Sequence, residues 1–560
     1  MTTLIFIRKQ SLLWAIFFGG LSVVGALQAA TPDAGQLSQP LIKQPDLNPS
    51  RPVELLRMPT PTKNATDAAS DIRILVNKVS VSGNTVIAST TLEAMVADLV
   101  GGQHNFAEIS AAVDRITIWY REHGYLVARA YLPAQDLQGG KLEIMVLEGL
   151  LGEQLVNNQS RINDVSAKHH LENIAPGVPL KSEAVDRAVL LLSDTPGVGG
   201  ARASLRPGAS VGTSDLIFEL SPGQVYSANV ELDNYGSHYT GENRLGGAFA
   251  INSPFKVGDQ LTVRALTSDQ KMTYTRIAYQ LPISGNGLKL GAAYSDMNYT
   301  LGREYADLNA HGKANSASVY LSYPFVRSQS VNAYGTLSLE QKDTKDTQIE
   351  AVDKKVKLLN VAFSGSRQDA IFGGGLNGFG ASIVFGHLAL DAVTLAQDAA
   401  SANANGSFNK INININRLQH VSEKNVLYVA ASGQLASKNL NSTEKFYLGG
   451  SDGIRAYPQG EGGGDVGLMV NAELRHIFGE KLQALLFFDA GTVTVNKDAY
   501  ITDAANTRNI AGAGFGLNAS FKALQFKSAV AWRLHGGPAL SEPISEDSNP
   551  RLWVQLSSTF

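Results

Sequence analysis

Residues 411–416 read Ile-Asn-Ile-Asn-Ile-Asn, and this alternation decides the fold class of the longest part of the chain. A helix would scatter the three isoleucines around its circumference, whereas a strand places all of them on one face. The same two-residue alternation dominates residues 223–560. This region is therefore predicted to form strands with one apolar and one polar face.

The last residues of the chain indicate where the apolar face points. Alternation alone fits a soluble sandwich with an apolar interior and also a membrane barrel with an apolar exterior. Leu552, Val554, Leu556 and Phe560 share one strand face, and Phe560 is the final residue. Outer-membrane barrels typically end in an aromatic residue that closes the last strand. We therefore interpret residues 223–560 as a transmembrane β-barrel and Phe560 as its C-terminal signal.

The length of this region predicts the number of strands. A sheet in lipid must close on itself, because lipid offers no partner to unpaired backbone groups. Bacterial barrels have an even number of antiparallel strands, and each strand with its connection takes roughly 20 residues, which gives about 16 strands. Three connections are expected to be long: residues 344–353, residues 396–407 and the glycine-rich stretch after Gly449.

The N-terminus has the pattern of an export signal. Arg8 and Lys9 precede an apolar run at 12–27, which is shorter than the roughly 20 residues of a membrane span. Residues 1–30 are predicted to be a secretory signal peptide. Residues 31–71 are rich in proline and are predicted to be a linker, with at most a short helix between Asp33, as N-cap, and Gln39.

Two stretches before the barrel share one order of elements. Residues 72–149 and, more faintly, residues 150–222 read as strand, helix, helix, strand, strand. In the first stretch, the second helix ends before Gly124 and carries its apolar residues on one face: Phe106, Ile109, Val113, Ile116 and Tyr120. We expect two tandem α/β modules, which outside the cell membrane more often bind chains than catalyse reactions.

The composition excludes several function classes. The 47 basic and 50 acidic residues give a net charge of -3, so no overall basic field favours nucleic acid. The absence of cysteine removes disulfides, cysteine-based zinc sites and thiol nucleophiles. No phosphate-binding loop, serine-nucleophile elbow or metalloprotease motif occurs, and the adjacent His169 and His170 lack accompanying ligands. We expect no enzymatic activity, no cofactor and no metal.

Five motifs occur in a characteristic order. GYLVARAYLPAQ at 124–135 with KLEIMVLEG at 141–149, and DTPGVGGARASLRPG at 194–208, look like the ends of two POTRA domains. The later motifs are DNYGSHYTG at 233–241, FYLGGSDGIRAYPQGEGGGDVG at 446–467 and LLFFDAG at 485–491. With these motifs, nearly the whole mature chain resembles the outer-membrane transporters of two-partner secretion, the haemolysin and filamentous haemagglutinin secretion-activation family of the POTRA-barrel superfamily.

The resemblance implies a sixteen-stranded barrel whose sixth loop folds back into the lumen. The tip motif of that loop, usually Val-Arg-Gly-Tyr, corresponds here to Ile454, Arg455, Ala456 and Tyr457. Alanine replaces the usual glycine, and alanine resists the positive φ that a glycine could adopt at this position. The partner motif, Phe-x-Asp-x-Gly, corresponds to Phe487, Asp489 and Gly491.

Alternation supports the same pairing independently. Along 485–491, Leu486 and Phe488 share one face while Phe487 and Asp489 share the other, so lipid-facing apolar residues would place Asp489 in the lumen. An inward carboxylate favours a cation, and a guanidinium can meet it with two parallel hydrogen bonds. We expect Arg455 to pair with Asp489 and hold the loop.

Two further groups of residues are expected to act in transport. The resemblance implies that the chain enters the barrel at a motif formed by Asp233, Asn234, Gly236, Tyr239, Gly241 and Arg244. Client recognition by the POTRA domains, by addition of an extended client to a strand edge or by a helix groove, is expected to involve Phe106, Tyr120, Arg129, Leu132, Leu205, Arg206 and Pro207.

The implied function is non-enzymatic export. The resemblance implies a translocator in the outer membrane of a Gram-negative cell, with periplasmic POTRA domains and a large secreted partner, an adhesin, haemolysin or toxin with an N-terminal secretion domain. Outer-membrane lipid and the barrel-assembly machinery are further implied partners. Whether residues 33–39 form the pore-plugging helix of some relatives stays open, although the segment is short and bounded by Pro40.

Two alternatives stay open. A barrel-assembly or lipoprotein-delivery chaperone of the wider superfamily would usually carry more POTRA repeats. A solute porin with periplasmic modules would need no tandem chain-binding domains.

Overall fold

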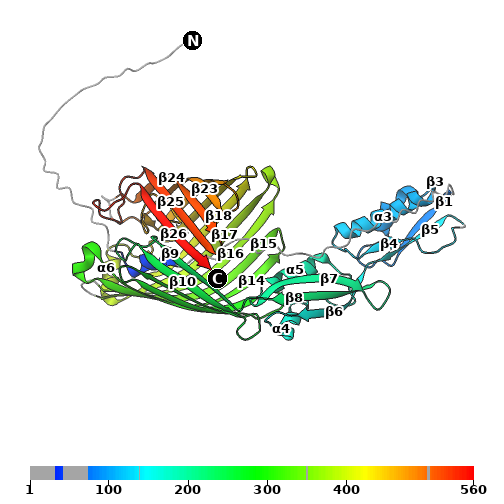
Figure 1. The fold of residues 1–560 in the computed structure, drawn as a ribbon, viewed down its shortest axis with the longest axis horizontal. Coiled ribbons are helices and arrows are strands. Elements are labelled where there is room, and N and C mark those ends of the chain that lie inside the picture. The colour runs from blue at the N-terminus through cyan, green and yellow to red at the C-terminus, as the bar shows by residue number, and fades with distance from the viewer. Residues whose placement is uncertain (1–31, 42–72, 138, 348–350, 501–504) are drawn as a thin grey trace, which may run out of the picture.

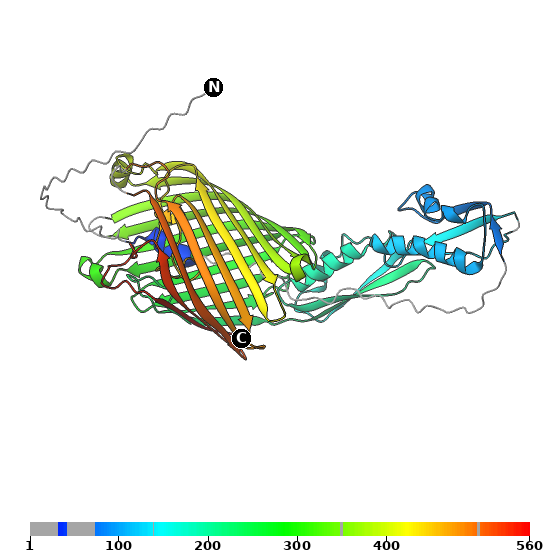
Figure 2. The same ribbon diagram turned by 90° about the horizontal axis from the view of Figure 1, so that it is seen from above.

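The computed structural model of the chain describes residues 32–41, 73–137, 139–347, 351–500 and 505–560. The predicted signal peptide and most of the predicted linker lie outside these residues. Two small α/β modules precede one large barrel, and Figures 1 and 2 show the first module at the end of the molecule farthest from the barrel. Among the described helices, none has the length and apolarity needed to cross a membrane.

The first module, residues 73–149, packs two helices on a three-stranded sheet. The sheet has the order β2-β5-β4, with β2 parallel and β4 antiparallel to β5, and β1 pairs separately with β3. Its elements are β1 (Ile74–Val76), β2 (Lys78–Ser82), α2 (Ser89–Met95), η2 (Ala97–Leu99), β3 (Gly102–His104), α3 (Phe106–Glu122), β4 (Arg129–Tyr131) and β5 (Lys141–Leu147).

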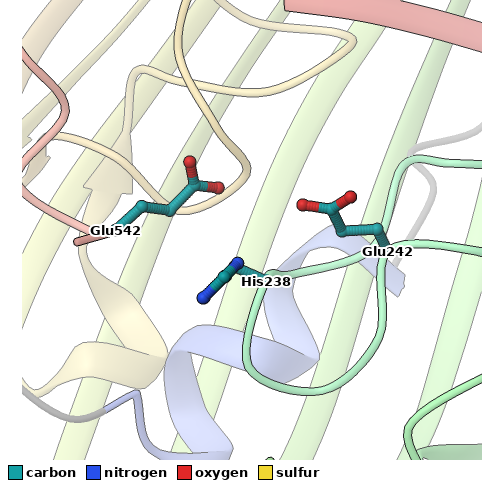
Figure 3. Close-up of side chains that lie close together, drawn as sticks. All are labelled: His238, Glu242 and Glu542. Atoms are coloured by element: carbon teal, nitrogen blue, oxygen red, sulfur yellow. The ribbon is translucent and has the colours of Figure 1, made fainter. Parts of the chain in front are cut away.

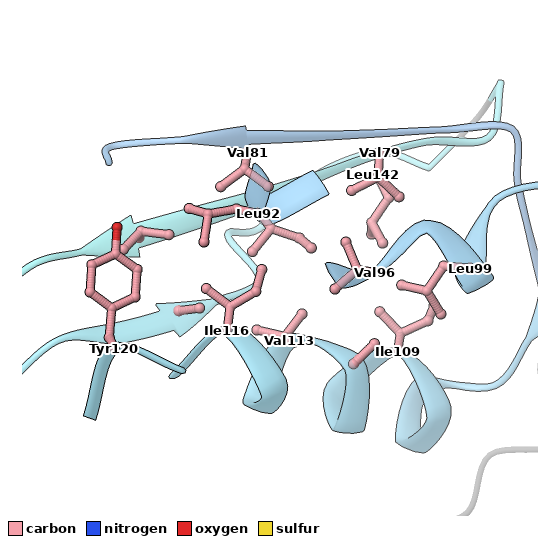
Figure 4. Close-up of a cluster of buried hydrophobic side chains, with 14 of the residues drawn as sticks. Val79, Val81, Leu92, Val96, Leu99, Ile109, Val113, Ile116, Tyr120 and Leu142 are labelled. Atoms are coloured by element: carbon pink, nitrogen blue, oxygen red, sulfur yellow. The ribbon is translucent and has the colours of Figure 1, made fainter. Parts of the chain in front are cut away.

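The ends and the apolar face of α3 follow from its sequence. Asn105 and Glu108 form a capping box, in which the Asn105 side chain accepts from the Glu108 amide at 2.8 Å. At the other end Gly124 has a φ of +88°, which ends the helix. Figure 4 shows the inner face of α3, with Ile109, Val113 and Ile116, packed against α2 and the sheet. The module therefore has its own core.

The second module, residues 150–222, repeats this topology. Its sheet has the order β6-β8-β7, with β6 parallel and β7 antiparallel to β8. Its elements are β6 (Leu150–Asn158), α4 (Asp164–His169), α5 (Ser182–Ser193), β7 (Val198–Pro207) and β8 (Thr213–Pro222). The second module has the expected order of strands and helices, and the first has it with two additional short strands, β1 and β3.

A closed barrel of sixteen antiparallel strands follows. The last strand, β26, pairs with the first, β9, and the Phe560 amide donates to the Ala228 carbonyl at 2.8 Å. The strands are β9 (Tyr226–Asp233), β10 (Arg244–Asn252), β11 (Gln260–Ser268), β12 (Thr273–Pro282), β13 (Lys289–Thr300), β14 (His311–Arg327), β15 (Val331–Thr347), β16 (Ala351–Asp369), β17 (Gly375–Leu390), β18 (Gly406–His420), β19 (Asn425–Ala436), β22 (Val466–Ile477), β23 (Leu482–Thr494), β24 (Thr507–Phe521), β25 (Leu524–His535) and β26 (Arg551–Thr559).

The alternation that predicted the strands also sets their two faces. Ile411, Ile413 and Ile415 are 40 to 55% exposed on the outer surface of β18, as expected for side chains that face lipid. The long loop predicted at 344–353 is wrong, because β15 and β16 continue as a paired hairpin through Thr347 and from Ala351. The connection 391–405 contains α6 (Ala392–Ala399), and a long connection at 536–550 was not foreseen.

Candidate functional site

The connection between β19 and β22, residues 437–465, folds into the barrel and is called the inward loop here. It carries η5 (Ser442–Glu444), β20 (Phe446–Tyr447) and β21 (Gly463–Gly464). Its tip residues Ile454, Ala456 and Tyr457 are fully buried and pack against inward side chains of the barrel wall: Phe487, Ile510, Ala531 and Trp553. The loop is therefore part of the contents of the lumen.

Arg455 and Asp489 form the central contact of this loop. Arg455 Nε and Nη2 donate to the two oxygens of Asp489 at 2.9 and 2.8 Å, and the Arg455 backbone amide donates at 3.1 Å. Asp489 is fully buried, while Leu486 on the opposite face of β23 is 62% exposed. The alternation therefore places Asp489 in the lumen, where it meets the guanidinium in a bidentate arrangement.

Two residues that the sequence did not single out for this contact complete it. Arg455 Nη1 donates to Glu473 Oε1 at 2.6 Å, so a second carboxylate from β22 shares the guanidinium. Asn471 Nδ2 donates to Asp489 Oδ1 at 2.9 Å and to the Gly453 carbonyl at 3.0 Å. The two-residue alternation of β22, which pairs with β23, could have predicted that both side chains face the lumen.

Aromatic residues of the wall enclose the arginine. The Arg455 guanidinium lies 3.5 Å from the centre of the Phe487 ring, a cation–π contact. Trp553 Nε1 donates to the Arg455 carbonyl at 2.7 Å. Gly491 leaves room for the loop, because a Cβ there would lie 2.7 Å from Leu448 Cδ2. Asp489 thus pairs with the charge of Arg455, the Phe487 ring packs on its guanidinium, and Gly491 faces the Leu448 and Ile454 side chains of the loop.

Alanine fits the tip motif in place of glycine. Ala456 has no positive φ, so the tip does not need a glycine backbone. Its methyl group faces Gly512 of β24, where an added Cβ would lie 2.4 Å from Ala456 Cβ. The Tyr457 hydroxyl lies 2.7 Å from the His535 carbonyl and 2.9 Å from the Gly537 carbonyl. The tip therefore reaches across to the last strands of the barrel.

Three buried carboxylates fix the base of the inward loop. Glu444 pairs with Lys342 and Lys410, each at 2.9 Å. Glu461 pairs with Arg508 at 3.0 Å, and Asp465 accepts from the Leu440 and Lys497 amides. Buried charges of this kind require partners, because desolvation of an unpaired ion is costly. The loop is thus held at its tip and at its base.

A short N-terminal helix, α1 (Ala34–Ser38), lies inside the barrel beside the inward loop, as Figures 1 and 2 show. Asp33 caps the helix and pairs with Lys354 of β16 at 2.7 Å. The Ala34 amide donates to Asp346 at 2.8 Å, and Ser442 of the inward loop donates to Asp33 at 2.6 Å. The sequence left a plug helix open, and the structure places this segment inside the barrel, where these contacts hold it.

The motif at 233–241 lies elsewhere than expected. It forms the connection between β9 and β10 at the end of the barrel opposite the modules, whereas the chain enters the barrel at β9 itself. Arg244 pairs with Asp233 at 2.7 Å. The Asn234 side chain donates to the Leu552 carbonyl and accepts from the Val554 amide, both at 2.8 Å. Asn234 thus fastens β9 to β26.

The glycines and the tyrosine of this motif shape the same connection. A Cβ on Gly236 would lie 1.9 Å from the Gly241 carbonyl oxygen, and Gly241 has a φ of +98°. Tyr239 is buried, and its ring lies 5.0 Å from the ring of Tyr305. The motif therefore builds a tight connection that packs on the connection between β13 and β14.

Within the described residues, one group of side chains brings metal-capable atoms together: His238, Glu242 and Glu542, within 4.8 Å of one another (Figure 3). Both oxygens of Glu542 already face Arg551, with Nη1 at 3.3 Å from Oε1. His238 Nε2 lies 3.2 Å from Glu304 Oε2. We interpret the group as a polar cross-link between connections far apart in the sequence.

The structure divides the residues expected to recognise a client. Phe106, Arg129, Arg206 and Pro207 are exposed, and Leu132 and Leu205 are half-buried against the module cores. Tyr120 is fully buried instead, and its hydroxyl donates to Glu148 at 2.7 Å. Because its side chain cannot reach a client, Tyr120 does not belong to a recognition surface. Its period-3.6 spacing signalled a core position.

Glu148 is the polar centre of the first module. Its carboxylate accepts from the Thr85 and Val86 amides at 2.8 and 2.9 Å, from the Thr85 hydroxyl and from Tyr120. Burial alone would raise the pKa of Glu148, but these hydrogen bonds outweigh burial and hold the pKa below its ordinary value. Burial and the neighbouring carboxylate raise the pKa of Tyr120.

The chain resembles known proteins over its whole length. Residues 212–519 match the family described as haemolysin secretion/activation protein ShlB/FhaC/HecB, and residues 74–149 match the ShlB-type POTRA domain. The heme/hemopexin transporter protein HuxB of Haemophilus influenzae (strain 86-028NP) is 25% identical over 98% of both chains. The outer membrane transporter CdiB of Dickeya dadantii is 22% identical over 71% of this chain and 72% of its own length.

Solved structures agree on the fold. CdiB from Escherichia coli matches with a TM-score of 0.73 and 18% identity, over 91% of this chain and 94% of that one. BamA from Haemophilus ducreyi, lacking POTRA domains 1–3, matches with a TM-score of 0.51. Barrel, modules and inward loop define an outer-membrane POTRA-barrel protein. Within that class, the chain belongs to the ShlB/FhaC/HecB family of haemolysin secretion/activation proteins.

Proposed function

We propose that this chain exports a secreted partner protein across the outer membrane through the lumen of its barrel. The family is a family of transporters that export partner exoproteins. The observation in the structure that carries the proposal is the inward loop, anchored at Asp489 on the inner wall of the barrel. A loop held by a bidentate ion pair can keep one position while a chain passes beside it.

The contents of the lumen support a closed resting state that can open. Helix α1 is held by polar contacts with Lys354, Asp346 and Ser442. Lys354 also lies 3.5 Å from Asp346, so it would keep one carboxylate partner after the helix and Asp33 had left. Release of α1 therefore costs less than breaking an isolated buried pair.

A solute porin is a weaker alternative. Small solutes need an open aqueous lumen, whereas this lumen holds both a helix and an anchored loop. The tandem modules also give a porin no advantage. The second alternative, a chaperone for barrel assembly, would usually carry more POTRA modules than the two found here.

Client recognition is proposed for the edge of the second module. Strand β7 ends its sheet, so its outer edge pairs with no other strand in the described part of the chain. An extended client could add to this edge by main-chain hydrogen bonds, with Leu205, Arg206 and Pro207 nearby. The edge of β4 is a poorer candidate, because it spans three residues and the Ala130 amide already donates to Thr117. Phe106 and Arg129 remain candidates on the first module.

The partner is proposed to be a large exoprotein with an N-terminal secretion domain, encoded in the neighbouring reading frame. The test is to co-express both proteins in a Gram-negative host and to measure the exoprotein at the cell surface by protease accessibility of intact cells. We expect export to fall at least tenfold with Arg455→Ala or Asp489→Ala, because either change leaves a buried charge unpaired.

A matched control is Asp369→Ala. Asp369 pairs with Arg417 at 2.8 Å near the periplasmic ends of β16 and β18, away from the inward loop, so its loss should leave export unchanged. The charge swap of Arg455→Asp with Asp489→Arg should regain part of the export, since the lost backbone hydrogen bond of residue 455 is not restored. Equal export by all variants would contradict a role of the pair, and no export by the native chain would contradict the proposed function.

A further inference from the structure

The outer surface of the barrel carries a cluster of lysines at one place. Val319, Leu339 and Leu359 face outward on β14, β15 and β16. Further along each strand toward the extracellular end, some of the outward-facing positions, which recur every second residue, are lysines. We call these four exposed side chains the lysine patch: Lys313, Lys345, Lys355 and Lys357. Among the described strands, all outward-facing lysines of the barrel belong to this patch.

The strand register places the patch at the extracellular edge of the apolar band. Leu339 pairs with Leu359, and the next outward pair is Gln341 with Lys357. One such step is about 7 Å along a strand. Lys345 lies three steps beyond Leu339, or about 20 Å along a strand that tilts by roughly 40°. The patch therefore spans the level of lipid head groups above the hydrocarbon.

A groove lies directly below the patch on the outer surface. It has a volume of about 720 Å³, and Gln341 and Lys357 are among its lining residues. The small side chains of Ala292 and Ala317 are exposed between larger apolar ones, which creates the hollow. Those larger neighbours are Ile277, Tyr294, Val319 and Leu339. An apolar groove that faces lipid and ends at a lysine has the shape of an acyl-chain site below a head-group site.

The charges of the patch are only partly balanced. Lys355 lies 3.5 Å from Asp343 and Lys345 lies 3.7 Å from Asp353, both as exposed pairs, which contribute little. Lys313 and Lys357 have no carboxylate within ion-pair distance among the described residues. Four lysines and three outward aspartates, Asp296, Asp343 and Asp353, leave an excess of one positive charge on this surface. Such a surface favours anionic head groups.

We propose that the outer surface of β12–β16 binds a phosphorylated glycolipid of the outer leaflet, with its phosphates at the lysine patch and one acyl chain in the groove. The outer leaflet of the outer membrane is built from such a lipid, whose disaccharide head carries phosphates. Lysine supplies mobile point charges that suit phosphates at variable positions. The site lies outside the lumen and is distinct from the export path.

The test measures binding of lipid A to the purified full chain in detergent by native mass spectrometry. The variant carries Lys313→Gln, Lys345→Gln, Lys355→Gln and Lys357→Gln. The control removes four exposed lysines at the periplasmic end: Lys424→Gln, Lys481→Gln, Lys522→Gln and Lys527→Gln. We expect bisphosphorylated lipid A to bind the patch variant at least tenfold more weakly and the control within twofold of the native chain. Heat-modifiable migration in gels verifies that each barrel is folded.

Other ligands and one further variant test whether the phosphates and the groove are what bind lipid A. Dephosphorylated lipid A should lose most of the affinity, and phosphatidylglycerol or free inorganic phosphate should not compete. Ala317→Phe fills the groove without touching a charge and should also weaken binding of lipid A severalfold. Equal binding by the native chain and the patch variant would overturn the proposal. Equal binding of phosphatidylglycerol would show a general anionic surface and would also overturn it.

Discussion

Ala456 and Gly512 form a complementary pair that sets how closely the inward loop approaches β24. A Cβ at position 512 would lie 2.4 Å from Ala456 Cβ, far inside contact distance. We expect Gly512→Ala to destabilise the loop position by about 1–3 kcal/mol through overpacking. Ala456→Gly in the same chain should restore part of this loss. Export of the partner, measured at the cell surface, should follow the same order, and no restoration would show that Gly512 acts through other neighbours.

Glu148 gives the first module a pH-dependent stability. Its pKa is lowered in the folded chain, so its contribution is fully present above its ordinary value of 4.5 and is lost as the pH falls through the lower folded value. Glu148→Gln should cost about 1–3 kcal/mol at pH 7, because buried donors lose their acceptor. It should also remove the pH dependence. Hydrogen exchange of residues 73–149 at pH 7 and pH 4, corrected for intrinsic rates, measures both effects.

At the scale of elements, α1 is too short to be stable as an isolated helix, so its position depends on its partners. Lys354→Met removes the cation shared by Asp33 and Asp346 and leaves two carboxylates side by side. We expect α1 to leave the lumen more often, and open-channel events in planar bilayers to increase at least tenfold. Lys424→Met, on a periplasmic turn, is the control and should not change conductance. Unchanged conductance with Lys354→Met would show that α1 does not limit the pore.

At the scale of the whole molecule, the second module is docked on the rim of the barrel by several polar contacts. Arg327 of β14 donates to both oxygens of Asp194 at 2.6 and 3.0 Å and is 4% exposed. Arg187 donates to the Pro324 carbonyl at 2.6 Å, and the His170 ring lies 3.0 Å from the Gly285 carbonyl. The second module is thus fixed to the periplasmic end of the barrel. None of the contacts named here involves the first module.

Asp194→Ala should loosen this docking, because it leaves Arg327 buried without its carboxylate. The chain has no cysteine, so spin labels at Ser210→Cys and Ser422→Cys report the distance between module and barrel without background. We expect the distance distribution to broaden by several ångströms. Asp98→Ala removes an exposed pair with Arg115 in the first module and should leave the distribution unchanged. An unchanged distribution with Asp194→Ala would assign the docking to the other contacts.

The sequence alone determined the strands, the two modules and the inward direction of Asp489. These properties depend on alternation and helical period, which are local, so Ile411–Asn416 or Phe106–Tyr120 are readable without neighbours. The tertiary structure decided which inward residues meet: Glu473 and Trp553 reach Arg455 only because of strand register and barrel closure. It also placed α1 in the lumen, since the burial of so short a helix depends on what the rest of the chain packs against it.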